Sequence, residues 1–271
     1  MRDKVSPYLC RIILFLILQG IFSLGCSTAK PVTESVRFAI IGNTSPASPF
    51  SGFTKYLPEV LAEIENRKPQ IIIHTGDALY GGSAADGILE SDLKRQLNIF
   101  FPMLKSLNTA VYTIPGEKDY YNGSIALYSG LTGKKTGYSF NYGSIHFICL
   151  SSSDSGKSFI DDEQLEWLKN DLNEFRDSNA IFVFAHHQLF PDKKKVKVQE
   201  KDEDLHKLFL EYRVKAVFSG SEKDYSTKLK DSVRYINAGC SFTTDKKDNK
   251  KGYRFYIINF INNEISIDPV R

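Results

Sequence analysis

Five apolar runs in this chain each end in polar residues, mostly after a glycine, and this pattern constrains the fold more than any other feature. Such short apolar runs are typical of buried parallel strands, because both faces of these strands are covered. The carboxyl ends of parallel strands meet at one crevice of a sheet, so we expect the following loops to face one another. The five segments are IIGNTS (40–45), HTGDALY (74–80), IPGEKD (114–119), FVFAHHQLF (182–190) and FSGSEKD (218–224).

Helical periodicity between these runs predicts an alternation of strands and helices, which is typical of one α/β domain. Pro102 is expected to bend or split the helix over residues 88–108. Alternating residues predict one hairpin around Asn141–Gly143 and a second hairpin over Asn262-Asn263. We predict helices over residues 56–64, 88–108, 161–175 and 203–214, a further strand over 233–240, and the hairpins over 137–153 and 253–270. Together these elements predict two packed sheets with helices outside.

The N-terminus has the composition of a targeting segment. A basic start precedes the apolar run at residues 12–25, which is shorter than the roughly 20 residues that a membrane span needs. The sequence SLGC (23–26) resembles a bacterial lipobox, whose cysteine is lipidated after cleavage, although Ser23 stands where leucine is usual. We expect a signal peptide over residues 1–25 and a tether over 26–35 that is lipid-anchored at Cys26. This places the protein in the bacterial cell envelope; plain secretion and an uncleaved anchor are the alternatives.

Net charge and cysteine content exclude two classes of protein. The formal charge is +3, and most of it comes from the N-terminal segment, so no nucleic-acid partner is predicted. Cys149 and Cys240 both fall in predicted strands. Two thiols of an exported chain can pair, but buried cysteines that pack as small apolar side chains are the favoured interpretation. No disulfide framework is predicted.

Three further segments carry a resemblance to a known family. The hairpin GYSFNYGSIHFICLSS (137–152), the helix QLEWLKNDL (164–172) and the segment YRVKAVFSGSEKDY (212–225) are similar to those of calcineurin-like metallophosphoesterases, especially the purple acid phosphatase-like branch. The resemblance extends from Val36 to the end of the chain. It implies a domain over residues 36–271 with a four-layer α/β/β/α sandwich of two mixed sheets flanked by helices.

The resemblance also implies a centre of two metal ions, with one ligand motif at each strand end. The family's G-D-x-x-Y motif is intact as Asp77 and Tyr80, and the histidine after the fourth run is retained as His186, with His187 beside it. The other motifs are altered. D-x-H reads Asn43, Thr44 and Ser45; G-N-H-[DE] ends in Glu117, Lys118 and Asp119; and G-H-x-H has Ser221 and Lys223 in place of its histidines.

These alterations affect the two implied metal ions differently. The first ion would need residues 43, 77, 80 and 223, where an uncharged amide and a protonated lysine are poor ligands, so we expect this site to be empty. The second ion would keep Asp77, Glu117 and His186, with Ser221 leaving an open position. Carboxylate and imidazole ligands suit Zn²⁺ or Mn²⁺, so at most one such ion is expected.

Charge favours the absence of both ions. Lys118 and Lys223 supply two positive charges beside the carboxylates of Asp77 and Glu117. A divalent ion within about 5 Å of an ammonium group meets repulsion of several kcal/mol at an effective dielectric constant of about 20. We therefore expect lysines in place of metals and no cofactor.

Simpler interpretations of the same residues remain open. Asp77 in a Gly-Asp turn can be a turn residue alone, and only its place among the other strand ends suggests a ligand. His186 and His187 can be ordinary hydrogen-bonded histidines, Tyr80 can belong to the core, and the two lysines can be solvated.

Three functions follow from these alternatives. The leading hypothesis is a non-catalytic or altered-function binding protein, whose pocket takes an anionic or phosphate-bearing ligand. The alternative is a phosphoester hydrolase with one metal on the three retained ligands, where Lys118 and Lys223 hold phosphate oxygens and His187, with Lys118, is a candidate catalytic group. The third is a scaffold that presents loops to a protein partner. The basic runs 192–204 and 243–252 are expected to be exposed loops, with binding of an anionic partner or membrane headgroups as a further alternative.

Overall fold

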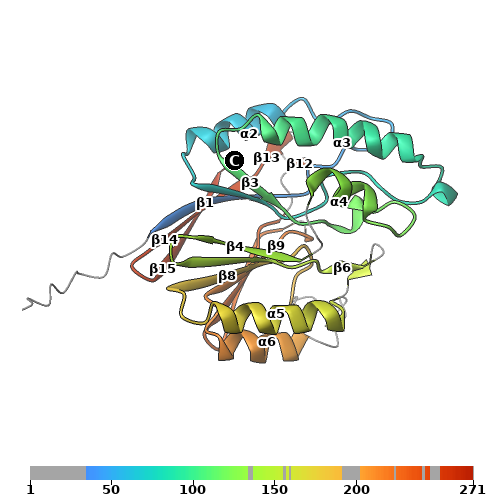
Figure 1. The fold of residues 1–271 in the computed structure, drawn as a ribbon. Coiled ribbons are helices and arrows are strands. Elements are labelled where there is room, and N and C mark those ends of the chain that lie inside the picture. The colour runs from blue at the N-terminus through green and yellow to red at the C-terminus, as the bar shows by residue number, and fades with distance from the viewer. Residues whose placement is uncertain are drawn as a thin grey trace, which may run out of the picture. The chain divides into compact units, whose positions relative to one another are not determined.

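Two mixed β-sheets lie face to face, and helices cover the outer face of each sheet (Figure 1). The computed structural model describes residues 35–133, 137–154, 157–158, 160–190, 202–222, 224–239, 242–244 and 251–270. Residues Glu34–Arg271 form one compact unit. The predicted four-layer arrangement is therefore confirmed.

The first sheet has five strands in the order β15-β14-β1-β2-β3. The strands β1, β2 and β3 are parallel, whereas β14 runs antiparallel to both β1 and β15. The parallel strands thus direct three loops to one edge. The strands are β1 (Val36–Ile41), β2 (Ile71–His74), β3 (Ala110–Thr113), β14 (Phe255–Ile261) and β15 (Glu264–Val270).

The second sheet has six strands in the order β10-β11-β9-β8-β5-β4. Its central strands β5, β8, β9 and β11 are parallel, and the hairpin partners β4 and β10 form the two edges. The strands are β4 (Tyr138–Tyr142), β5 (Ile145–Cys149), β8 (Ala180–Phe184), β9 (Ala216–Ser219), β10 (Ser226–Lys230) and β11 (Val233–Asn237). Two small ribbons are β6 (Ser153–Asp154) with β7 (Lys157–Ser158), and β12 (Phe242–Thr244) with β13 (Lys251–Tyr253).

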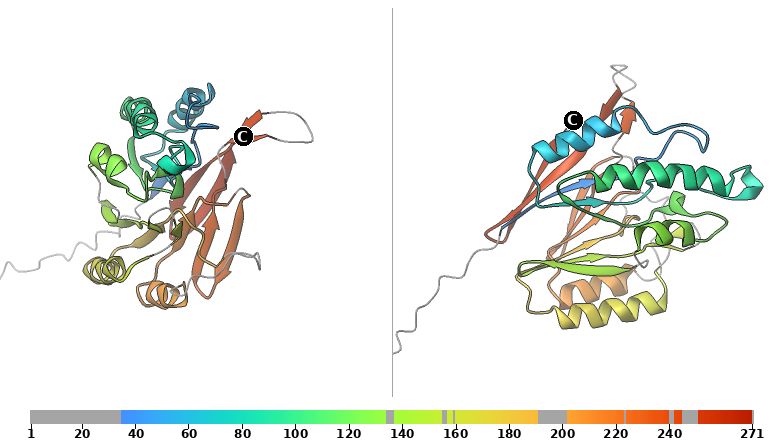
Figure 2. Two further views of the ribbon diagram at one scale, coloured as in Figure 1. Left: turned by 90° about the vertical axis from the view of Figure 1, so that its right-hand side faces the viewer. Right: turned by 45° about the horizontal axis from the view of Figure 1, so that its top comes forward.

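The helices form the two outer layers. Figure 2 shows α2, α3 and α4 on one side of the sheets and α5 and α6 on the other. The apolar side chains of α2 and α3 pack on the five-stranded sheet, and those of α5 and α6 pack on the six-stranded sheet. The helices are α2 (Leu57–Asn66), α3 (Glu90–Lys105), α4 (Ala126–Thr132), α5 (Asp162–Glu174) and α6 (Asp202–Glu211), with short 3₁₀ turns at η1 (Ala84–Asp86) and η2 (Glu117–Asp119).

An aromatic core joins the sheets. Phe38 of the first sheet is fully buried, and its ring centroid lies 5.5–5.8 Å from the ring centroids of four phenylalanines in the second sheet. Aromatic pairs at such distances add about 0.5–1.5 kcal/mol each beyond their buried area. These contacts fix the position of one sheet against the other. The four partner residues are Phe147, Phe182, Phe184 and Phe218.

Most predicted elements are found, with some corrections. Both hairpins are confirmed, and Asn262 and Asn263 take the left-handed conformation that their turn requires. The prediction that Pro102 could split its helix was wrong, since α3 continues through this residue. The strand β10 and the helix α4 were not predicted.

Several predictions fall outside the described part of the chain. They include the targeting segment with Cys26, the residues Lys223 and Cys240, and most of the two basic runs. Cys149 is buried in β5. Among the described residues, no helix is long and apolar enough to cross a membrane.

Candidate functional site

The carboxyl ends of the parallel strands meet, as their shared pattern predicts. The backbone N–H of Asn43 donates to the Gly76 carbonyl at 2.9 Å, which ties the β1 and β2 loops together. The N–H groups of Gly220 and Ser221 donate to the His186 carbonyl at 2.9 and 2.8 Å, which ties the β8 and β9 loops together. The side-chain amide of Asn43 donates to the Gly220 carbonyl, so this residue links the two sheets.

Glycines allow the loops to approach closely. Gly76 has a φ of 96°, which an L side chain rarely adopts. A Cβ at Gly116 would lie 2.3 Å from Asp77 Oδ1 and 2.8 Å from His186 Cε1. The loops after β2, β3 and β8 therefore pack with no room for a side chain between them.

Asp77 is the centre of this site. Its side chain is only 5% exposed, and its backbone is also left-handed, with a φ of 55°. The backbone N–H of Lys118 donates to Asp77 Oδ1 at 3.0 Å, while the Lys118 ammonium lies 3.5 Å from Asp77 Oδ2. His186 Nε2 lies 3.5 Å from Asp77 Oδ1. One buried carboxylate thus faces both a lysine and a histidine.

The protonation of His186 follows from its other contact. His186 Nδ1 lies 2.7 Å from the Thr75 carbonyl, which only accepts, so this nitrogen carries the hydrogen. Burial lowers the pKa of His186, although the charge of Asp77 acts in the opposite direction. The neutral ring then directs the lone pair of Nε2 at Asp77 Oδ1. Two acceptors that face each other favour a proton or a cation between them.

Asp119 connects the loops after β2 and β3 through hydrogen bonds to its carboxylate. Its buried carboxylate accepts the backbone N–H groups of Asp77, Leu79 and Gly116 at 2.9, 2.8 and 2.7 Å. Burial and the nearby charge of Asp77 raise the pKa of Asp119 to about 7, against these three donors. Asp119, which the sequence predicted as a pocket residue, therefore stabilises the loop that carries Asp77.

Glu117 is paired with His187. Glu117 Oε2 lies 3.6 Å from His187 Nε2, and this contact with His187 lowers the pKa of Glu117. His187 Nδ1 lies 3.2 Å from the hydroxyl of Ser152, which also accepts the His187 backbone N–H at 2.9 Å. Ser152 is fully buried, so it orients His187 and is closed to solvent. Half of the Glu117 side chain is exposed.

The remaining predicted positions contribute mainly through their backbone or their neighbours. Ser45 N–H donates to the Asp77 carbonyl at 3.0 Å, and half-buried Tyr80 donates its N–H to Gln96 Oε1 at 2.7 Å. The Ser221 hydroxyl accepts the Gln188 N–H at 3.2 Å. Lys223 lies outside the described residues.

His74 is a site residue that the sequence analysis missed. Its Nδ1 accepts the Gly76 N–H at 3.3 Å, so its Nε2 donates to the Thr44 hydroxyl at 2.9 Å. Burial, together with the nearby His186, lowers the pKa of His74 to about 3. This neutral ring supports the turn that carries Asp77. Its position at the end of β2, directly before the Gly-Asp turn, is the signal that was available.

The residues present fit a two-metal centre poorly. Both oxygens of Asp77 already face donors of Lys118, and Glu117 pairs with His187 rather than with Asp77. Within the part of the chain that the structure describes, no group of three or more His, Cys, Asp or Glu side chains could hold a metal ion. Asp77 and His186 face each other as two ligands of one ion would.

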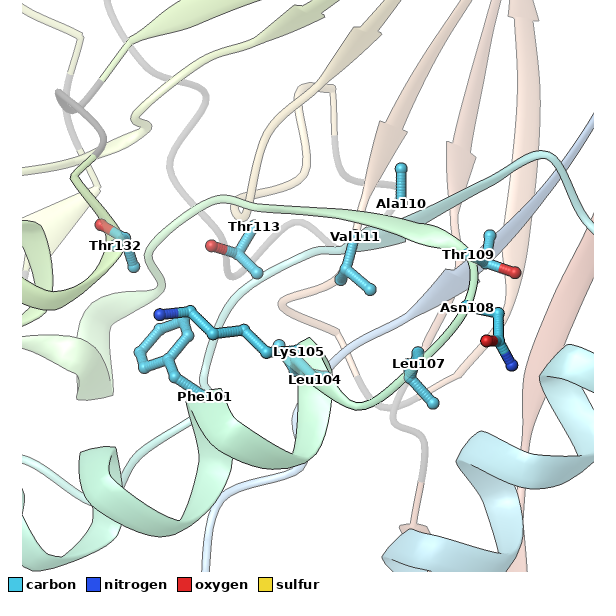
Figure 3. A pocket seen from close by; sticks show the side chains of 10 residues that line it. All are labelled: Phe101, Leu104, Lys105, Leu107, Asn108, Thr109, Ala110, Val111, Thr113 and Thr132. Carbon is cyan, nitrogen blue, oxygen red and sulfur yellow. The ribbon is translucent and has the colours of Figure 1, made fainter.

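A cavity of about 430 Å³ lies elsewhere, between the end of α3, the strand β3 and Thr132 (Figure 3). Its wall includes Phe101, Lys105, Val111 and Thr113. None of the predicted site residues lines it, so it is separate from the strand-end site.

Comparisons with known proteins agree with this fold. A model of the calcineurin-like phosphoesterase family matches residues 36–220. The structure resembles a dimetal phosphatase from Danio rerio, with a TM-score of 0.64 and 12% identity over 87% of this chain and 98% of that chain. It also resembles a purple acid phosphatase from yellow lupin seeds, with a TM-score of 0.62 and 15% identity over 88% of this chain and 52% of that chain.

A third similar structure is GAP50, the anchor in the inner membrane complex of Plasmodium. Its TM-score is 0.57, with 16% identity over 87% of this chain and 84% of that chain. At these identities the likeness shows the fold alone. No curated protein matches the sequence.

Proposed function

Because the chain belongs to the calcineurin-like phosphoesterase family, whose members usually bind divalent metals, we propose that its strand-end site is an altered metal centre. In this proposal Lys118 takes the place of a metal ion, and the site binds a phosphate-bearing anion without dimetal catalysis. The protein is then a non-catalytic or altered-function member of its family.

The ion pair between Lys118 and Asp77 carries this proposal. The ammonium lies 3.5 Å from Asp77 Oδ2, and the backbone N–H of the same lysine donates to Oδ1. A divalent ion on this carboxylate would meet the ammonium at close range, with repulsion of several kcal/mol at an effective dielectric constant of about 20. The lysine thus neutralises the buried carboxylate and competes with a metal.

The exposure of Lys118 supports anion binding. Its side chain is 46% exposed, and an ammonium has three N–H donors, of which the contact with Asp77 needs one. The others can donate to phosphate oxygens. Lys223 is the second cation that we expect to contribute.

Metal and phosphate titrations test the proposal together. A metal site with a Kd of about 10 μM, given about 1 mM Mn²⁺ or Zn²⁺, would stabilise the protein by about 2.7 kcal/mol. For a domain of this size the Tm would rise by about 5–10 °C. We expect no resolvable rise with metal, measurable binding of inorganic phosphate by calorimetry, and about tenfold weaker phosphate binding by Lys118→Met, since a charge-assisted hydrogen bond contributes at least about 1.4 kcal/mol. A large metal response, or phosphate binding unchanged in Lys118→Met, would contradict it.

One observation favours a second candidate, a phosphoester hydrolase with a single metal. The lone pair of His186 Nε2 is directed at Asp77 Oδ1 over 3.5 Å, and its hydrogen-bonded Nδ1 is typical of a metal-ligating histidine. Asp77 and His186 would hold the ion, and Glu117 would join them after leaving His187. Such an ion supplies Lewis-acid chemistry when bound. Lys118 would hold a phosphate oxygen, and the metal titration separates the two candidates.

We further propose that the protein is exported and attached to the bacterial cell envelope through lipid on Cys26. The support is the apolar run at residues 12–25 and the sequence SLGC that ends it. A protein partner at the membrane would fit the third hypothesis, in which the fold is a scaffold.

A further inference from the structure

A second cavity lies between the two sheets, on the flank where β10 and β15 form the sheet edges. Its volume is about 300 Å³. The opposite flank is closed, because Tyr112 of β3 stacks on Phe140 of β4. In Figure 2 the orange and red C-terminal strands of both sheets lie on the flank of β10 and β15. The lining residues are Tyr225, Arg254, Tyr256, Ile267 and Pro269.

The strand register places this cavity at the end of the sheets that carries the strand-end site. Tyr256 lies opposite Ile40, one residue before the end of β1. Tyr225 directly precedes Ser226, which lies opposite Asn237, the last residue of β11. The cavity is therefore close to the carboxyl ends of the parallel strands.

The segment that carries Tyr225 is held in place by side chains. The Asn237 amide donates to the Asp224 carbonyl at 2.6 Å. The Gln188 amide donates to the Ser226 hydroxyl at 3.2 Å, which connects this segment to the loop of His186. The backbone of Tyr225 is therefore held in place, which lowers the entropy cost of binding a ligand.

The two tyrosines form an aromatic wall. Their ring centroids are 5.2 Å apart with an interplanar angle of 24°, so the rings are stacked. Tyr225 remains 38% exposed. Together with Ile267 and Pro269 it offers an apolar surface on which a planar ring can stack.

Arg254 is the cation of the cavity. Its Nε is shielded from solvent and has no hydrogen-bond partner among the described residues. Buried donors are normally paired, so an acceptor is missing here. A guanidinium group binds carboxylates and phosphates through two parallel N–H donors. An anionic group on a ligand would supply that acceptor after a small rotation of the side chain.

We propose that this cavity binds a small aromatic anion, with its ring against Tyr225 and its carboxylate or phosphate on Arg254. The volume is at the lower end of the range for ligand pockets, which suits a single ring. This site uses none of the strand-end residues and does not depend on the function proposed for them.

Calorimetry with benzoate tests the proposal, with cyclohexanecarboxylate as the comparison compound. We expect benzoate to bind the full chain more tightly than cyclohexanecarboxylate. Tyr225→Ala and Arg254→Gln should each weaken benzoate binding by about tenfold or more, whereas Tyr225→Phe should keep it. The matched control is Tyr142→Ala, because Tyr142 is also 38% exposed but lies in the β4 strand on the opposite flank.

A Lys118→Met variant separates the two sites. It should leave the affinity for benzoate unchanged, because Lys118 does not line this cavity. The proposal is overturned if Lys118→Met removes benzoate binding, if Tyr225→Ala and Arg254→Gln bind as the wild type does, or if the wild type binds no aromatic anion. Circular dichroism and thermal melts establish that each variant is folded.

Discussion

Lys118 contacts both oxygens of one buried carboxylate, and this contact is the basis of the proposed function. Its backbone N–H and its ammonium group reach the two oxygens of the same carboxylate of Asp77. A buried carboxylate needs hydrogen bonds and a positive charge, whether they come from an ion or from a side chain. Here a single lysine supplies both.

Removing the ammonium should therefore destabilise the protein. Lys118→Met leaves Asp77 buried without its cationic partner, and we expect a loss of about 1–2 kcal/mol, reduced from a fully buried pair because Lys118 is half exposed. Added Mn²⁺ should restore part of the loss. Urea denaturation with and without Mn²⁺ measures both effects.

The matched control is Lys94→Met. Lys94 pairs with Glu90 on the surface of α3, and its side chain is 57% exposed, so its loss should change stability by less than about 0.5 kcal/mol. If Lys118→Met is as stable as Lys94→Met, Lys118 is a solvated lysine and not a replacement for a metal.

Sequence predicted which residues gather at the site but not how they pair. The common strand-end pattern was enough to bring Asp77, Lys118 and His186 together. Glu117 was expected beside Asp77 but pairs with His187, because the side-chain direction depends on the turn η2 and on its neighbours. Ser152, like His74, was missed, since its role exists only through contacts across the fold.

Among the elements, buried strands were the most predictable. A strand such as β8 is covered on both faces, so its sequence is an unbroken apolar run. The edge strand β10 has the sequence STKLK, with serine and lysines in place of such a run, and it was missed. The helix α4 has only seven residues, too few for a clear periodicity. Both β10 and α4 are therefore determined by their pairing and exposure in the fold, and not by the intrinsic strand or helix propensity of their residues.

The close approach of the β2, β3 and β8 loops gives a test at this scale. A Cβ on Gly116 would lie 2.4 Å from Asp77 N and 2.3 Å from Asp77 Oδ1. We expect Gly116→Ala to destabilise the protein by about 1–3 kcal/mol through overpacking, as measured by urea denaturation.

Gly130→Ala in α4 is the control for this substitution. A Cβ on Gly130 would meet nothing within 4 Å, and alanine is a better helix former than glycine. This variant should be as stable as the wild type or more stable by about 0.5–1 kcal/mol. Equal effects of the two substitutions would show that the loops are not closely packed.

At the scale of the whole molecule, the aromatic contacts between the sheets explain why the layers were predictable. Phe38, Phe182 and Phe218 each fall in a predicted strand, and each ring packs in the core between the sheets. The alternation of strands and helices along the chain determines which faces of the sheets are covered by helices. The sequence alone did not reveal the cavity beside Tyr225, because its wall combines the segment before β10 of one sheet with strands β14 and β15 of the other.

The proposed membrane attachment is also a property of the whole chain. Wild-type protein should require detergent for extraction from bacterial membranes, since the several acyl chains of a lipoprotein anchor durably. Cys26→Ser should release the protein or leave it unprocessed, as fractionation and the mass of the mature chain would show. Unchanged extraction and processing of this variant would contradict lipidation at Cys26.

The ion pair of Lys118 and Asp77 has one more consequence. A metal ion leaves its site when a chelator competes for it or when its supply falls below the dissociation constant. An ammonium group on the chain cannot be exchanged, stripped or replaced by a different ion. If Lys118 takes the place of a metal as proposed, the charge beside Asp77 is the same in metal-starved and metal-rich surroundings, and the shape of the loops around it should not depend on metal supply.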